Sequence, residues 1–151
     1  PPLRDGLPSV TASVLPALAT SLASGNAQVR GATPPLLDTL LSHVDHAALI
    51  PPLANCALYA NPKARPAMVD RLRAVSHQLY PSKPQLVVKH AVPAAFRLLE
   101  ENRTDTRAGT VLLLRTLYAA MGDVLFEHAM KIPPNTQQRL HELIQVRDTT
   151  L

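Results

Sequence analysis

The chain has 151 residues and a formal net charge of +4, with hydrophobic residues at 46 %, aromatic residues at 3 % and no tryptophan. This length suits one domain whose core is built from Leu, Val, Ile and Ala, a mix that favours packed helices, and five glycines are too few for an all-β fold with many tight turns. No segment approaches the roughly 18 uninterrupted apolar residues of a membrane span, and the single cysteine excludes an internal disulfide.

Three windows of the chain align without a gap, and each predicts two helices joined by a short polar turn. They read 14-VLPALATSLASGNAQVRGAT-33, 49-LIPPLANCALYANPKARPAM-68 and 91-AVPAAFRLLEENRTDTRAGT-110. All three share a proline in the first helix, an asparagine near the middle and an arginine fourteen positions after the proline: Pro16, Pro51, Pro93; Asn26, Asn61, Asn102; Arg30, Arg65, Arg107. Recurrence of the proline predicts a kink inside the first helix of each window.

The turn residues of these windows predict where each second helix begins. Asn26 and Asn61 are expected as N-caps, because an asparagine oxygen can accept hydrogen bonds from the first amides of a helix. Pro66 is expected in the first turn, where a missing N–H costs little. Two residues after each arginine stands a small residue, expected to let the paired helices approach closely: Ala32, Ala67, Gly109.

The last part of the chain predicts a divergent fourth unit. Residues 123–131 fit a short first helix, 132-IPPN-135 a turn, and Asn135 with Gln138 a capping box for a helix running to about Arg147. Residues 148–151 are expected to be a frayed end. Together, the three aligned windows and this fourth unit predict a single helical repeat domain over residues 1–151, with repeats at about 7–43, 45–80, 83–121 and 123–147.

The recurring proline, asparagine and arginine resemble the HEAT repeat. This resemblance implies an all-α solenoid of antiparallel helix pairs, about four repeats long, with first helices on one face and second helices on the other. Turns within repeats then line one edge and turns between repeats the opposite edge.

The two expected edges differ in charge. The intra-repeat turns carry five basic residues with one main acidic exception: Arg30, Lys63, Arg65, Arg103 and Arg107, with Asp105. The inter-repeat turns offer Lys83, opposed by Asp45 and Asp123. The sequence therefore predicts a positive ridge along the intra-repeat edge.

Two interpretations of the ridge remain open at this point. The repeated arginines are typical of fold residues that bond to a neighbouring turn, whereas Lys63 and Arg103 do not recur at one register position and are candidate binding residues. Gln28 occupies the place in the first repeat that Lys63 occupies in the second.

A basic ridge on this edge is similar to that of TOG domains of microtubule regulators, including the CLASP and crescerin families. The similarity implies αβ-tubulin binding through Lys63, Arg103, Arg65, Arg107, Arg30 and Gln28, in the cytoplasm and cytoskeleton, with a cilium or centrosome as the setting. TOG domains usually have more repeats and often a tryptophan in the first turn, and both are missing here. The alternative is a HEAT scaffold that binds another protein or peptide along an apolar groove on its second helices.

No catalytic motif is present, which predicts a non-enzymatic protein without a cofactor or small-molecule substrate. His43 and His46 flank Asp45 in an expected solvated turn. Cys56 is expected as a buried, inert thiol in a reducing compartment.

Five aromatic residues are expected to pack, which disfavours nucleic acid as a partner: Tyr59, Tyr80, Phe96, Tyr118 and Phe126. The chain begins without Met and shows no signal peptide, as expected for an excised piece of a longer protein.

Overall fold

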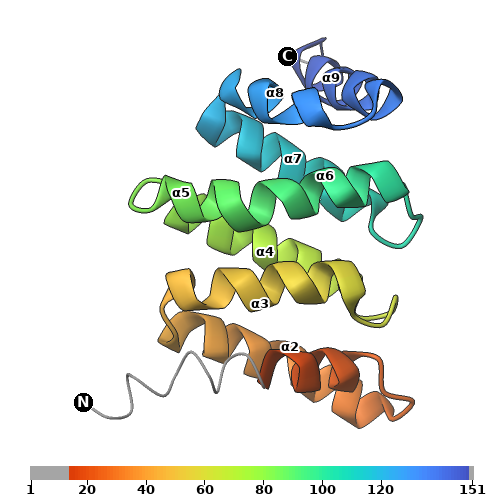
Figure 1. Cartoon of the computed structure of the whole chain (residues 1–151). Helices are drawn as coiled ribbons and strands as arrows, with labels where there is room; N and C mark the ends of the chain where they lie inside the picture. Colours follow the sequence, from red (N-terminus) through yellow and green to blue (C-terminus); the bar gives the residue numbers. More distant parts are fainter. Residues whose placement is uncertain (1–13, 150–151) are drawn as a thin grey trace.

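Pairs of antiparallel helices stack in one direction to form an all-α solenoid (Figure 1). The computed structural model describes residues 14–149, with side chains up to residue 144. Helical residues 14–22 are followed by α2 (Ala27–His43), α3 (His46–Tyr59), α4 (Arg65–Leu79), α5 (Pro84–Leu86), α6 (Val92–Glu101), α7 (Arg107–Met121), α8 (Val124–His128) and α9 (Pro134–Thr149). Within residues 14–149 no β-strand occurs, so the predicted fold class is confirmed.

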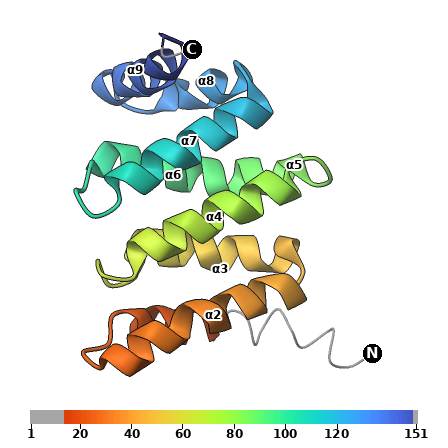
Figure 2. The ribbon, with the colours of Figure 1, turned by 180° about the vertical axis from the view of Figure 1, so that it is seen from behind.

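First and second helices occupy opposite faces of the stack. Figure 1 shows α3 and α6 on the near face, and the reverse view in Figure 2 brings α2, α4 and α7 to the front. A salt bridge from Arg71 to Asp38 at 3.1 Å joins α4 to α2 across the seam between their repeats. The short helix α8 and a 3₁₀ turn at Ala129–Lys131 supply the first helix predicted for the fourth unit.

Aliphatic side chains fill the space between the two helix layers. The twelve largest fully buried side chains are all Leu, Ile or Met. Phe96 is the one buried aromatic residue among those described. Cys56 is 4 % exposed, and burial raises the pKa of its thiol, as expected for a packing residue. Tyr118 and His141 each lie against Phe126, which joins α7, α8 and α9. Tyr59 does not pack as predicted, since it is 65 % exposed at the end of α3.

Of the two asparagines predicted as N-caps, one caps a helix and the other does not. Asn26 is the N-cap of α2 and accepts from the amides of Gln28 and Val29. Asn61 instead closes a separate turn, because its Oδ1 accepts from the amide of Lys63 at 2.9 Å and α4 starts only at Arg65. Pro66 does lie in the first turn of α4.

The last helix begins two residues earlier than predicted. Asn135 lies inside the first turn of α9, which starts at Pro134, a residue with no amide hydrogen to satisfy there. Gln138 bonds forward to Glu142, so the predicted capping box does not form. The neighbouring Gln137 donates through Nε2 to the carbonyls of Met130 and Ile132, which ties the start of α9 to the preceding turn. α9 continues to Thr149, and the rest of the predicted frayed end lies outside the described residues.

The recurring prolines have different local surroundings. Pro51 lies inside α3, whereas Pro93 follows a π-helical turn at Val87–Ala91 that leads into α6. Because Pro93 cannot donate to the carbonyl of Lys89, the regular ladder is interrupted there, and the amide of Val92 donates to the carbonyl of Val87. A distortion beside the proline is thus present in the third repeat, and the kink predicted at Pro16 and Pro51 stays a prediction.

Gly109 provides close packing between repeats rather than within one. A Cβ built at Gly109 would lie 3.1 Å from Cγ1 of Val69, which belongs to α4 of the preceding repeat. The small residue was predicted to let the two helices of one pair approach closely, here α7 and α6, and this prediction is therefore wrong for Gly109. Its lack of a side chain brings two second helices together instead.

Candidate functional site

The intra-repeat turns line one edge of the stack. Figure 1 shows the connections before α2, α4 and α7 on the same side, with the connections between repeats on the other. The predicted basic residues of these turns therefore share an edge, because each repeat places its turn at the same end of its helix pair. We call this set the basic ridge: Gln28, Arg30, Lys63, Arg65, Arg103 and Arg107.

The three repeated arginines fold back onto their own turns. Arg30 donates to the carbonyl of Ser24 at 2.6 Å, and Arg65 donates through Nε to the carbonyl of Ala60 at 2.9 Å. Arg107 donates to Oδ1 and to the carbonyl of Asn102 at 3.3 and 3.4 Å. Arg65 and Arg107 thus bond the C-cap carbonyl of the first helix, and Arg30 bonds a carbonyl in the turn just after it. A binding role for these arginines stays a prediction.

Burial separates Arg65 from the other two repeated arginines. Arg65 is 7 % exposed, while Arg30 and Arg107 are open to solvent. A guanidinium that is bonded and covered by protein presents little charge to a partner, whereas an exposed one adds to the field along the edge. Arg30 and Arg107 therefore contribute more to the charge of the basic ridge than Arg65 does.

Lys63 and Arg103 are placed differently from the repeated arginines. Lys63 is exposed, and its ammonium has no ion pair within the described part of the chain. The hydrogen bond from its amide to Asn61 fixes the backbone from which the Lys63 side chain extends. Arg103 is 40 % exposed and donates through Nε to Asp105 at 3.2 Å. Gln28 is exposed in the first turn of α2, where its amide is held by Asn26.

The opposite edge carries mixed charge. Lys83 is exposed just before α5, and Asp123 is exposed just before α8. Asp45 is the N-cap of α3 and accepts from the amide of Ala47. His43 ends α2 and His46 begins α3, and no metal-binding cluster is found among the described residues.

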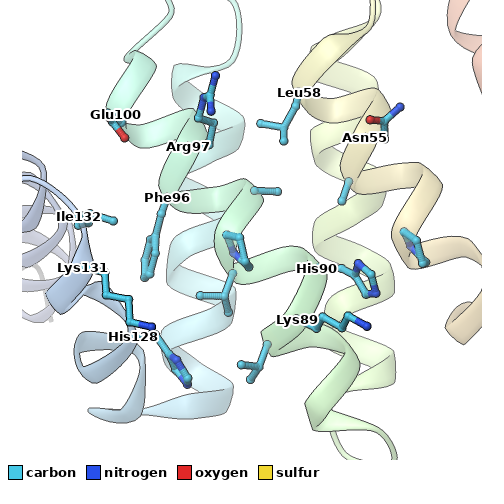
Figure 3. A pocket seen from close by; sticks show the side chains of 16 residues that line it. Asn55, Leu58, Lys89, His90, Phe96, Arg97, Glu100, His128, Lys131 and Ile132 are labelled. Atoms are coloured by element: carbon cyan, nitrogen blue, oxygen red, sulfur yellow. The ribbon is translucent and has the colours of Figure 1, made fainter.

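A groove of about 650 Å³ crosses the first-helix face (Figure 3). Its apolar lining includes Leu58 of α3, Phe96 of α6 and Ile132. Lys89 and Lys131 lie on its rim. The generic-scaffold interpretation expects its groove along the second helices, whereas this groove lies on the face of the first helices.

The ionisable groups around this groove are mainly basic. Glu100 is the one carboxylate among the described lining residues. Arg97, which also lines the groove, lies 3.7 Å from Glu101 within α6. Burial and the neighbouring charge of Lys89 lower the pKa of His90, so this side chain stays neutral to lower pH than an ordinary histidine. The groove therefore combines an apolar floor with a positive rim.

Membrane-spanning character is weak in the described residues. None of their helices is by itself long and apolar enough to cross a membrane, and only α7 joined to Val124–Lys131 reaches the required composition, as a pair bent by 116°.

Comparison with known proteins finds relatives that are microtubule regulators by name. The chain is 29 % identical over 157 residues to TOG array regulator of axonemal microtubules protein 1 from Homo sapiens, and equally to the Mus musculus protein. Both alignments cover 97 % of this chain but only 9 % of the relative. No family model matches the sequence, and no solved structure matches it. Similarity over nearly the whole chain suggests a TOG-related protein.

Proposed function

We propose that this chain is a non-catalytic, TOG-like module of HEAT repeats that binds αβ-tubulin through the basic ridge. The observation that carries the proposal is the gathering of solvent-accessible cations on the intra-repeat edge of the described chain, above all Lys63 and Arg103. The similarity to a regulator of axonemal microtubules supports a microtubule-related role and a setting in the cytoskeleton or the cilium.

Electrostatics makes this edge suited to an acidic protein surface. Charges of one sign along a line speed association with a partner of opposite charge and fix the register in which it docks. Asn26 and Asn61 accept hydrogen bonds from backbone amides of their turns, and the repeated arginines donate to backbone carbonyls, so little loop ordering is needed on binding. Exposed charges are screened over about 8 Å at physiological ionic strength, so binding should weaken with salt.

Co-elution with soluble αβ-tubulin in gel filtration tests the proposal. Wild-type protein should co-elute at low salt and less at moderate salt, and a Lys63→Glu, Arg103→Glu double variant should lose co-elution with its helical circular dichroism intact. Lys83→Glu is the matched control, because it reverses one charge on the opposite edge. Co-elution that survives the double variant, or that Lys83→Glu reduces as strongly, would contradict binding through the ridge.

The groove of Figure 3 favours a second candidate function, a scaffold that binds an acidic segment of another protein. Its cationic rim and apolar floor suit a peptide with carboxylates beside a large apolar side chain. A Lys89→Glu, Lys131→Glu variant separates the two functions. Tubulin co-elution should be unchanged in that variant if the ridge is the site, and lost if the groove is.

A further inference from the structure

A second hollow lies at the seam between the third and fourth helix pairs. It has a volume of about 370 Å³ and is lined by residues of α6, α7 and α9. Leu98, Leu99 and Leu143 supply apolar surface, and Arg107, Arg115 and Arg139 bring three guanidinium groups to the same space. We call this hollow the seam pocket. It shares Arg107 with the basic ridge but is built mainly from helix residues that the ridge does not include.

Basic groups outnumber acidic ones in the described lining of the seam pocket. Glu142 is the one carboxylate among the described lining residues, and its Oε1 accepts from Gln138 at 3.3 Å. The protein contacts of Arg107 and Arg139 are long, at 3.3 and 3.4 Å to Asn102 and 3.5 Å to Thr136. A guanidinium has five N–H donors, so both side chains keep donors that a ligand can use. A planar fork of this kind matches the two oxygens of a carboxylate.

Thr110 provides an independent sign of a missing polar partner. It lines the pocket and is 3 % exposed, and its Oγ1 has no hydrogen bond among the described residues. A buried hydroxyl without a partner is costly and uncommon in folded proteins. An oxygen of a bound ligand would satisfy it.

We propose that the seam pocket binds a carboxylate side chain next to an apolar residue, both carried by an acidic segment of a partner protein. Arg107, Arg139 and Thr110 would hold the carboxylate, and the leucines would cover the apolar neighbour. The carboxylate of Glu142 opposes a more highly charged phosphate, and the described lining residues include no aromatic side chain to stack a base. The inference does not require that the partner be tubulin.

Fluorescence anisotropy with a short labelled peptide of glutamates flanking one leucine tests this proposal. The full chain should bind it at least about tenfold more tightly than the same peptide with glutamines. Arg139→Met should weaken binding by about tenfold, and Thr110→Val by about threefold or more. Thr110→Val keeps the side-chain volume and removes the unpaired hydroxyl, so the variant should unfold at the same temperature as the wild type or at a higher one. If the hydroxyl had a purely structural role, the unfolding temperature would fall instead.

Matched controls separate the pocket from general charge and from the ridge. Lys83→Gln removes one positive charge far from the pocket and should change peptide affinity by less than about twofold. The Lys63→Glu, Arg103→Glu variant should keep peptide binding even where it loses tubulin. Equal affinity for both peptides, an Arg139→Met effect no larger than that of Lys83→Gln, or displacement by millimolar inorganic phosphate would overturn the proposal.

Discussion

Arg65 is the residue at which the basic ridge meets the core. Its side chain is 7 % exposed, and its Nε donates to the carbonyl of Ala60 at 2.9 Å. We expect Arg65→Met to lower the free energy of unfolding by about 1.5–3 kcal/mol, the range for a hydrogen bond from a charged group. Arg30→Met removes an exposed equivalent and should cost less than about 1 kcal/mol. Urea unfolding followed by circular dichroism measures both.

Arg65→Lys completes this comparison, because it keeps the charge but loses the planar fork. It should be destabilising like Arg65→Met while leaving tubulin co-elution intact in the folded fraction. Equal stability of Arg65→Met and Arg30→Met would show that burial does not distinguish the two arginines.

Single residues also mark the limit of what the sequence can predict. Asn26 and Asn61 share a register position, and each accepts from the amide two residues on. Only Asn26 caps a helix, since the turn after Asn61 continues through Pro62 and Lys63 before α4 begins. A side chain that can close either a cap or a turn leaves the two indistinguishable from sequence.

At the scale of the helix, apolar spacing was enough to place the helix pairs and their order. It could not place the π-helical turn at Val87–Ala91 or the partner of Gly109, because these depend on neighbouring elements rather than on local periodicity. The charged edge was predictable because it follows from repetition. The pairing of Arg103 with Asp105 and the seam pocket follow from side-chain contacts that no repeat pattern contains.

Two helix glycines test whether close packing or helix propensity dominates at each site. Nothing lies within 4 Å of a Cβ built at Gly31 in α2, so Gly31→Ala should raise the free energy of unfolding by about 0.5–1 kcal/mol. Gly109→Val should lower it by about 1–3 kcal/mol, because its Cβ would already lie 3.1 Å from Val69. Thermal unfolding of the two variants measures the difference. Stabilisation by Gly109→Val would contradict the close approach of α7 to α4.

Across the whole molecule, each helix pair packs mainly on its neighbours, so stability should vary along the stack. The ridge turns 60–64 and 102–106 lie beside α4 and α7, which pack against each other and against their own first helices. The candidate tubulin-binding residues of these two turns are therefore next to helices that pack on both sides within the described chain. Rigid support of this kind lowers the cost of ordering a binding surface.

Native-state hydrogen exchange can test this gradient directly. Amides of α4 should exchange at least about tenfold more slowly than those of residues 138–144 in α9, a difference of about 1.4 kcal/mol in opening free energy. The reason is packing: α4 is covered by α3 on one side and α7 on the other, whereas the described part of α9 contacts α6 and α7 from one side of the stack. Gly109→Val should reduce protection in α4 and α7 together, since it separates those two helices. Uniform protection from α3 to α9 would instead mean that the stack opens as one cooperative unit, and the ridge would then have no rigidity beyond that of the whole fold.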